Sequence, residues 1–385
     1  MMKSTFMKKL LNGVEVEWTL IGDKRFVEIA NSNRKPVKAS LRKLGRTPYF
    51  GANNIQDYVE GYTHDGVFIL IAEDGSASLE KYSIQWATGQ FWANNHVHVL
   101  RGTGGLDSRF LYHYLKTVNF IPFLSGGVRA KLTKVKLVEI SIPIPCPENP
   151  EKSLEIQAEI VRILDTFTEL TAELTAELTA ELTARKKQYN YYREQLLTFE
   201  EGEVEWKALG ELAENHDSMR KPITSGLREI GDIPYYGASG IVDYVKDFIF
   251  DGDYLLVSED GANLLARRTP IAFSISGKSW VNNHAHVLKF NTYAERKYIE
   301  CYLNSIDLTP YISGAAQPKL NQRNLNAIQI PNPSLEDKER IVSILDKFET
   351  LTTSIQEGLP REIELRQKQY EYYRNMLLSF PKEEV

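Results

Sequence analysis

The sequence lacks the features of a disulfide-stabilised, secreted or membrane protein. Its only two cysteines, Cys146 and Cys301, have no motif partners, which excludes a disulfide framework and a cysteine-rich zinc site. No apolar run approaches the roughly 18 residues of a membrane span. No apolar stretch of about 7–15 residues follows the lysines of the first eleven residues, so we expect no secretory signal. Together these absences predict a cytoplasmic protein in a reducing compartment.

Two catalytic signatures are also missing from the sequence. There is no G-x-x-x-x-G-K-[ST] loop that would bind ATP. The Asn/Asp-Pro-Pro-aromatic motif of amino-methyltransferases is absent as well. The sequence therefore predicts no catalytic residues in this chain and no metal site.

The charge is distributed unevenly along the chain. The net charge of −5 combines +6 for residues 1–150, −5 for 151–202, −3 for 203–333 and −3 for 334–385. A protein that gripped DNA phosphates unaided would be more basic than this. We infer that a basic partner would complete any grip on DNA.

The sequence contains an internal duplication. Residues 49–59 (YFGANNIQDYV) match residues 235–245 (YYGASGIVDYV) at 7 of 11 positions. FWANNHVHVL at 91–100 matches SWVNNHAHVL at 279–288, and residues 184–199 match residues 365–380 at 10 of 16 positions. Because the matches keep the same order over most of the chain, they indicate a gene duplication, and two copies are too few for a solenoid.

Each copy divides into a globular domain and a long helix. Short β-branched and aromatic runs separated by Gly, Pro and Asn predict an α+β globular domain of mixed short strands and helices. Ser153 and Ser334, each followed by acidic residues, suit helix N-caps. We therefore expect globular domains over 1–150 and 203–333, with long helices over 151–202 and 334–385.

The two long helices are expected to pair with each other. Apolar residues recur at a spacing of three to four, and Thr-Ala-Glu-Leu repeats three times over 171–182. Burying one such stripe against its duplicate would give an antiparallel coiled coil with pseudo-two-fold symmetry. Gly358 and Pro360 predict a kink or break in the second helix. The expected pairing or partner positions are Leu170, Leu174, Leu178, Leu182, Tyr189, Tyr192, Leu351, Ile355, Leu359, Ile363, Tyr370 and Tyr373.

This order of parts resembles the specificity subunits of type I restriction–modification systems. The resemblance covers nearly the whole chain and rests on the Thr-Ala-Glu-Leu units, the RKP…PYYGA stretch, the NNHxH segments, the SG…KL…IPxP segments and the duplicated KQYxYYRxxLLxF ending. It implies a non-catalytic subunit with two target-recognition domains that bind double-stranded DNA. It also implies two methyltransferase subunits and restriction subunits as partners, which would hold S-adenosylmethionine, ATP and Mg²⁺ while adenine N6 is methylated and unmodified DNA is cut.

The duplication itself makes a bipartite target the natural expectation. Two similar readers on antiparallel helices would meet half-sites on opposite strands, separated by unread bases. The helices would then act as a ruler, since one four-residue unit adds about 6 Å, close to two base pairs. The likeness of the copies further predicts related half-sites. Alternatives are a stand-alone two-domain repressor or scaffold and a self-sufficient nuclease or methylase.

The DNA-binding candidates are basic and amide residues near the turns of each copy. Arg and Lys bind phosphates, and Arg, Asn and Gln can also read base edges, although a solvated face or a plain loop is an equally good interpretation. The candidates are Arg34, Lys35, Lys38, Arg42, Lys43, Arg46, Asn53, Asn54, Arg129 and Lys131 in copy one, and Arg220, Lys221, Arg228, Ser239, Gln317 and Lys319 in copy two.

Two further motifs have both a chemical and a structural interpretation. On a strand, His96 and His98 would share a face like metal ligands, but turn and core hydrogen bonding is favoured over metal, and DNA contact stays open. Glu73-Asp74 and Glu259-Asp260 resemble nuclease carboxylates, but both precede glycine, which favours a turn after a strand. The clustered tyrosines are expected to pack in a core, with contact to a methyltransferase as the alternative.

Overall fold

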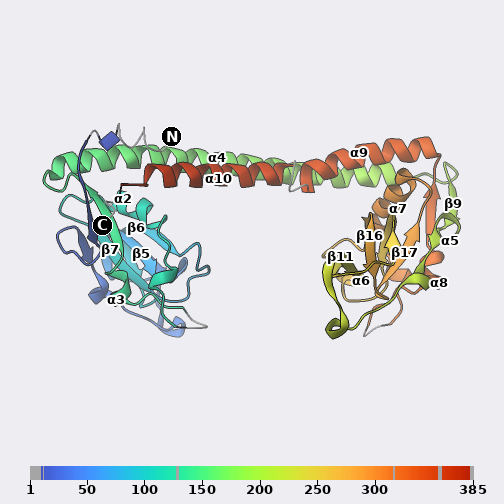
Figure 1. Cartoon of the computed structure of the whole chain (residues 1–385), viewed down its shortest axis with the longest axis horizontal. Helices are drawn as coiled ribbons and strands as arrows, with labels where there is room; N and C mark the ends of the chain where they lie inside the picture. The colour runs from blue at the N-terminus through green and yellow to red at the C-terminus, as the bar shows by residue number, and fades with distance from the viewer. Residues whose placement is uncertain (1–9, 12, 127–129, 315–316, 354–357, 382–385) are drawn as a thin grey trace. The chain divides into compact units, whose positions relative to one another are not determined.

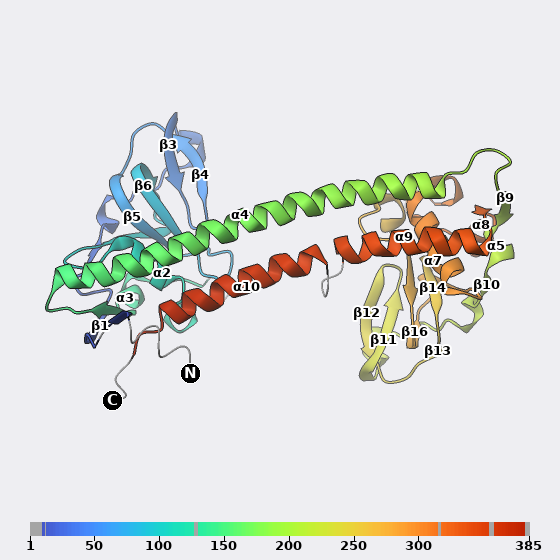
Figure 2. The same cartoon turned by 90° about the horizontal axis from the view of Figure 1, so that it is seen from above.

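The computed structural model describes residues 10–11, 13–126, 130–314, 317–353 and 358–381. They form two compact units, each with one globular domain (Figures 1 and 2). Unit 1 comprises Met1–Glu177 and Ile363–Val385, and unit 2 comprises Leu178–Glu362. Each unit therefore contains the start of its own copy's helix and the end of the other copy's helix.

Unit 1 contains a six-stranded sheet in the order β2-β7-β5-β6-β3-β4 and a separate pair, β1-β8. Its strands are β1 Val16–Leu20, β2 Val27–Ile29, β3 Leu44–Phe50, β4 Ile55–Val59, β5 His64–Ala72, β6 Ile84–Ala93, β7 Val97–Gly102 and β8 Ser141–Pro145. Its helices are α2 Ser108–Leu115, α3 Lys134–Leu137 and the start of α4 Pro150–Leu197, with 3-10 turns η1 Asn31–Asn33, η2 Ala39–Leu41 and η3 Ile121–Phe123.

Unit 2 repeats this plan with its strands divided over three sheets. Its sheets have the orders β10-β17-β14-β15, β12-β11-β16-β13 and β18-β9. Its strands are β9 Glu205–Ala208, β10 Glu214–Asn215, β11 Ile230–Gly237, β12 Gly240–Val245, β13 Phe250–Asp251, β14 Tyr254–Ser258, β15 Ala272–Ile275, β16 Lys278–Val281, β17 Ala285–Lys289 and β18 Gln329–Asn332. Its helices are α5 Leu209–Leu212, α6 Asn263–Ala266, α7 Tyr293–Ser305, α8 Gln322–Asn326 and α9 Leu335–Thr353, with η4 Asp217–Met219, η5 Ser225–Leu227 and η6 Thr309–Tyr311.

The strand pairing is the same in both units. β3 pairs antiparallel with β4 and parallel with β6, which places Tyr49 opposite Trp92. β11 pairs in the same way with β12 and β16, which places Tyr235 opposite Trp280. The predicted α+β fold with an internal duplication is therefore confirmed, and the duplication extends to the register of the strands.

Each core is closed by the helix end that the other copy contributes. In unit 1, Leu377, Leu378 and Phe380 are buried in the same cluster as Ile160 and Leu164 of α4. The ring of Phe380 meets Phe110 of α2 edge to face at 5.8 Å. In unit 2, Leu197 at the end of α4 is buried with Ile341 and Leu345 of α9. The duplicated LLxF ending is thus a core element of both units.

The first predicted helix cap is wrong and the second is confirmed. α4 begins at Pro150, and the Asn149 side chain accepts a hydrogen bond from the Lys152 N–H at 3.0 Å. Proline suits this first position because its missing N–H would have no partner there. Ser153 instead lies buried in the first turn and accepts from Gln157 at 2.9 Å. Ser334 caps α9 by accepting from the Asp337 N–H at 3.1 Å.

Aromatic residues join the helices within each unit. In unit 1, Phe167 and Thr168 of α4 contact Tyr373 and Tyr370 of α10 (Leu359–Leu377), with a 3.0 Å hydrogen bond between the hydroxyls of Thr168 and Tyr370. Because the contacts run in opposite order along the two helices, these segments are antiparallel. In unit 2, Tyr189 and Tyr192 of α4 pack on Phe348 of α9. These four tyrosines therefore pack between helices without being buried in a core, and Tyr192 stays 39% exposed.

The leucines of the Thr-Ala-Glu-Leu units are only partly buried. Leu170 and Leu174 remain 48% and 40% exposed, whereas Leu178 and Leu182 are half-buried. A repeat of four slightly exceeds the 3.6 residues of a helical turn, so the stripe drifts around the helix and cannot bury every leucine against one neighbour.

The second copy has two helices where the first has one. α9 ends at Thr353 and α10 begins at Leu359, with Pro360 as its second residue, so the predicted interruption near Gly358 and Pro360 is confirmed. Leu351, Leu359 and Ile363 are half-buried in these helices. Residues 354–357, including the predicted pairing residue Ile355, lie outside the described residues.

Leu164 and Leu174 make a matched test of the packing of α4. Leu164 is fully buried, so Leu164→Ala should destabilise unit 1 by about 2–5 kcal/mol through lost burial and a cavity. Leu174→Ala, at a more exposed site on the same helix, should cost below about 1 kcal/mol. Hydrogen exchange of unit 1 amides measures this without assuming two-state unfolding. Equal losses of protection in the two variants would contradict the packing described here.

Candidate nucleic-acid interface

The basic segment before β3 forms a braced arm that recurs before β11. We call residues 37–46 arm 1 and residues 223–232 arm 2. The Arg42 guanidinium lies over the Tyr49 ring, 4.1 Å from its centroid, donates to the Val37 carbonyl at 3.1 Å and pairs with Asp57 at 3.3 Å. Arg228 braces arm 2 through Tyr235, Ile223 and Asp243, at 4.4, 3.1 and 2.9 Å. Both arginines therefore hold the arm in shape.

Arg34 and Arg220 also have intramolecular partners. Arg34 pairs with Glu73 at 2.6 Å and donates to the Val97 carbonyl at 2.7 Å. Arg220 makes the matching contacts with Glu259 and the Ala285 carbonyl, at 2.5 and 2.9 Å. These contacts leave the two guanidinium groups little capacity for phosphate.

Lys131 and Lys319 supply a second cation to the same carboxylates. Lys131 pairs with Glu73 at 2.9 Å and Lys319 pairs with Glu259 at 3.1 Å, and both lysines stay about half exposed. Burial alone would raise the pKa of Glu73, but hydrogen bonds from Arg34 and Lys131 outweigh it and lower that pKa. Glu73 is therefore an ionised, internally neutralised carboxylate, as is typical of a structural ion pair rather than a nuclease centre.

The other DNA-binding candidates differ in whether their side chains have partners within the protein. The Asn53 side chain stabilises the turn at 75–77, because it donates to the Gly75 carbonyl at 2.8 Å and accepts from the Ala77 N–H at 2.9 Å. Among the described residues, the remaining candidates have exposed side chains with no hydrogen bond or ion pair, and they are Lys35, Lys38, Lys43, Arg46, Asn54, Lys221, Ser239 and Gln317. Arg129 lies outside the described residues.

The NNHxH segments form turns, so their histidines do not share a face. Residues 94–96 connect β6 to β7, and the Asn94 side chain accepts from the His96 N–H at 2.8 Å. His96 is exposed and its Nδ1 lies 2.5 Å from Asp74. His98 is fully buried on β7 and donates through Nε2 to the Leu132 carbonyl at 2.7 Å. The favoured prediction of turn and core hydrogen bonding is therefore confirmed, and the alternative of a shared metal-ligand face does not apply because His96 lies in the turn that precedes β7.

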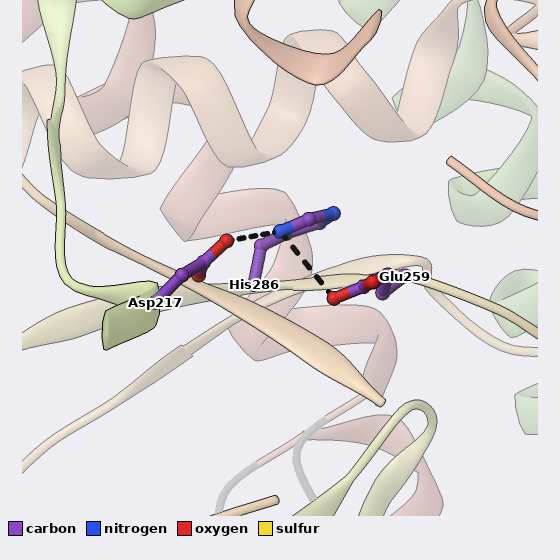
Figure 3. A group of neighbouring side chains, drawn as sticks. All are labelled: Asp217, Glu259 and His286. Carbon is purple, nitrogen blue, oxygen red and sulfur yellow. Dashed lines mark hydrogen bonds and ion pairs between the residues drawn. The ribbon is translucent and has the colours of Figure 1, made fainter. Parts of the chain in front are cut away.

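A buried polar network beside β17 differs between the two copies' cores. His286 Nδ1 lies 2.6 Å from Asp217 and 3.8 Å from Glu259 (Figure 3). His286 Nε2 donates to the Leu320 carbonyl at 2.7 Å. In unit 1 the residue in the place of Asp217 is Asn31, whose amide nitrogen lies 2.9 Å from His98 Nδ1.

Asp217, Glu259 and His286 lie close enough together to resemble a metal site. Their ligand atoms already have protein partners, however, since Glu259 carries Arg220 and Lys319. Burial would raise the pKa of Asp217, but hydrogen bonds from His286 and the Val287 N–H lower it. We therefore interpret the cluster as an ion-pair network that anchors η4 to the sheet.

The partners of each imidazole determine where its hydrogens lie. His286 faces acceptors at both ring nitrogens, a carbonyl and an ionised carboxylate, so each nitrogen must carry a hydrogen. His98 Nδ1 faces an amide donor, because the Asn31 oxygen is used by the Val99 N–H at 2.9 Å. Burial lowers the pKa of His98, in keeping with a neutral ring.

Exchanging Asn31 and Asp217 should exchange the hydrogen on Nδ1 of the two histidines. We expect ring ¹H–¹⁵N spectra to show a hydrogen on Nδ1 of His286, which faces the Asp217 carboxylate, and none on Nδ1 of His98, which faces the Asn31 amide. Asp217→Asn should remove the Nδ1 hydrogen of His286, and Asn31→Asp should place one on Nδ1 of His98. The same Nδ1 state in both histidines of the unmodified protein would refute the assignment.

The sequence interpretation missed the apolar residues at the tips of the arms. Leu41 and Leu44 in arm 1, and Leu227 and Ile230 in arm 2, are exposed. The available signal was that both copies place aliphatic residues at these positions within otherwise polar segments. Charge drew attention to the same segments, but two of the three arginines in the arms, Arg42 and Arg228, brace the arm.

The geometry describes a duplicated reader: two domains with the same strand register, each carrying a braced arm with free polar and apolar side chains at its tip. The comparisons with known proteins agree. The family model "Type I restriction modification DNA specificity domain" matches residues 15–184 and again 201–365. The chain belongs to this family of type I restriction–modification specificity subunits, which are recognition components and not catalytic ones.

Relatives of full length support the assignment. The specificity subunit of the Escherichia coli type I restriction enzyme EcoR124I/EcoR124II is 36% identical over 424 residues, covering 100% of this chain and 99% of that protein. S.HindORF215P of Haemophilus influenzae is 48% identical over 399 residues, covering 98% of both chains. The solved S subunit from M. genitalium has the same fold, with a TM-score of 0.51 at 17% identity over 96% of this chain and 98% of that one.

Within the described residues, no helix combines the length and the apolar character needed to span a membrane.

Proposed function

We propose that this specificity subunit reads a bipartite duplex target, with one target-recognition domain for each half-site. The observation that carries the proposal is the duplicated arm, which shares its brace and strand register between the units. B-DNA has local two-fold axes, so two related readers suit half-sites on opposite strands with unread bases between them. Phosphate contacts from Lys35 and Lys221 would position each domain, because both are exposed in the two copies.

We further propose that the helices bind two methyltransferase subunits, with restriction subunits beyond them. Tyr191 and Tyr372 of the duplicated KQYxYYR motif are 59% and 52% exposed, beside tyrosines that are used in helix packing. Leu170 and Leu174 are exposed on α4. Exposed aromatic and aliphatic side chains on a helix are typical of a surface that a partner covers.

The chemistry would then belong to the partners. S-adenosylmethionine would be bound by the methyltransferase subunits, and ATP and Mg²⁺ by the restriction subunits, with the target adenine flipped out of the duplex for reaction. This chain would contribute sequence choice and spacing. A stand-alone repressor would instead bind its site without a methyltransferase, so binding that requires the methyltransferase separates the two functions.

Deleting one four-residue unit of α4 tests the spacing role. Removing Thr175–Leu178 keeps the repeat in phase and shortens a helix that is continuous over 48 residues by about 6 Å. We expect the unread spacer of the target to shorten by one or two base pairs while both half-sites stay the same. The measurement is the N6-methyladenine motif of cells that carry the deletant.

Glu177→Gln in the same unit is the control, because it changes the charge of α4 without changing its length. It should leave the spacer as in the unmodified protein. A deletant that methylates the original motif would defeat the ruler, and a deletant without any methylation would call for measuring DNA binding by the assembled complex.

A further inference from the structure

The tips of the two arms expose aliphatic side chains at matching positions. Leu41 and Leu44 are 70% and 90% exposed, and Leu227 and Ile230 are 77% and 95% exposed. These are the most exposed large apolar side chains in the described part of the chain. Burying one such side chain contributes about 1.5–3 kcal/mol of favourable free energy. Both copies expose this aliphatic pair, so a ligand that covers it gains binding free energy.

A β-bulge fixes the direction in which each tip points. Leu44 and Thr47 both pair with Val59, so two residues of β3 between them have no partner. Ile230 and Ile233 pair with Val245 in the same way. Bulges re-aim side chains and are common beside functional sites.

The bulge requires glycine in both copies. A Cβ on Gly45 would lie 2.2 Å from the Val59 carbonyl oxygen, and one on Gly231 would lie 2.5 Å from the Val245 carbonyl oxygen. Neither distance is sterically possible, so the backbone of each tip depends on the absence of a side chain there. Together with the Arg42 and Arg228 braces, the glycines hold the apolar pairs in a preformed position.

Arm 1 leaves space between itself and the rest of unit 1. Under arm 1 lies an open cavity of about 280 Å³ lined by Lys35, Leu41, Tyr49 and Trp92 among others. In Figure 1 the loop leading into β3, drawn in blue, lies at the end of unit 1 farthest from α4. The tip of arm 1 is therefore remote from the part of α4 that belongs to unit 1, where Leu170 and Leu174 are exposed.

The charge beside the apolar pair reverses between the copies. Arm 1 carries Lys43 and Arg46, whereas the equivalent residues of arm 2 are Glu229 and Asp232. Glu229 pairs with Lys246 at 3.0 Å on the surface, while no described residue pairs with Asp232 or Arg46. A protein partner that used one surface on both arms would meet opposite charges. Two DNA half-sites of different sequence present different base edges, so they fit this pattern.

We propose that the bulged tip of each arm enters the major groove and that Arg46 and Asp232 select different bases in the two half-sites. The proposal rests on the proposed DNA-reading function. Arg46 can donate to guanine O6 and N7, whereas the Asp232 carboxylate can accept from cytosine N4. The aliphatic pair lies against base edges and thymine methyl groups, which both half-sites can offer. The half-sites therefore differ at the base pair that faces position 46 or 232.

Exchanging the two charges tests base selection. Arg46→Asp and Asp232→Arg are made separately, each variant is assembled with its methyltransferase subunits, and bound sequences are selected from a randomised duplex pool. We expect each variant to change base preference at one position of one half-site, by about 5- to 150-fold, the range for one bidentate base contact. Unchanged preference, with affinity for all sequences lowered alike, would overturn the proposal.

Lys38→Thr provides the matched control, because it gives arm 1 the residue that arm 2 has at that position. As a phosphate contact it should weaken binding to all sequences alike and reduce the salt dependence by about one ion. An unmodified complex that selects no sequence would reject the proposed function itself, whatever the arm variants do.

Leu44→Ser and Ile230→Ser test what covers the apolar pair. Both side chains are almost fully exposed, so the fold should tolerate the change. We expect assembly with the methyltransferase to be unchanged and affinity for the selected duplex to fall about tenfold, as for the loss of one good contact. The proposal would be overturned if the variants assembled poorly with the methyltransferase while the complexes that did form kept their DNA affinity. That result would show that a protein covers the tips.

Discussion

Each globular domain is completed by the end of the other copy's helix. Leu377, Leu378 and Phe380 fill the core of unit 1, and Leu197 fills that of unit 2. The indole N–H of Trp18 donates to the Pro381 carbonyl at 2.8 Å, which ties the last described residue to β1. Because burying a leucine or phenylalanine is worth about 1.5–3 kcal/mol each, neither unit keeps its full stability without the other copy's sequence. The duplication is therefore a folding requirement as well as a repetition of readers.

This exchange explains why the ending is one of the segments that the two copies share. The LLxF ending must fit a core built by the other copy, so a change in one ending must suit a domain that lies far away in the sequence. The tyrosines before it meet equivalent residues, Phe167 in unit 1 and Phe348 in unit 2. Surface positions such as 43 and 229 meet no such demand and have opposite charges in the two copies.

The sequence predicted what depends on local pattern and failed where a distant partner decides. The duplication, the long helices, the Ser334 cap and the break near Pro360 follow from spacing and residue type. The roles of Arg34 and Arg42 do not, because their partners, Glu73 and Asp57, lie 39 and 15 residues away along the chain. The turn and core roles of His96 and His98 could be predicted, because the two asparagines before His96 mark a turn locally, but their partners Asp74 and Leu132 could not. Charge marked the arms correctly but could not separate bracing arginines from free ones.

The two units share one domain structure but have different side chains at the tips of their arms. The arginine, glutamate, tyrosine and tryptophan contacts that brace each arm recur in both units, so the backbone of each arm is set before any ligand is met. Copy two has Asp217 where copy one has Asn31. This difference changes the hydrogen-bond partner at Nδ1 of the buried histidine, His286 or His98, while the strand register stays the same. A buried polar residue of the domain can be replaced only by one that keeps its neighbours hydrogen-bonded. Arg46 and Asp232 have no partner among the described residues, so a reversal of charge there costs the fold little, and sequence preference can diverge without rebuilding the domain.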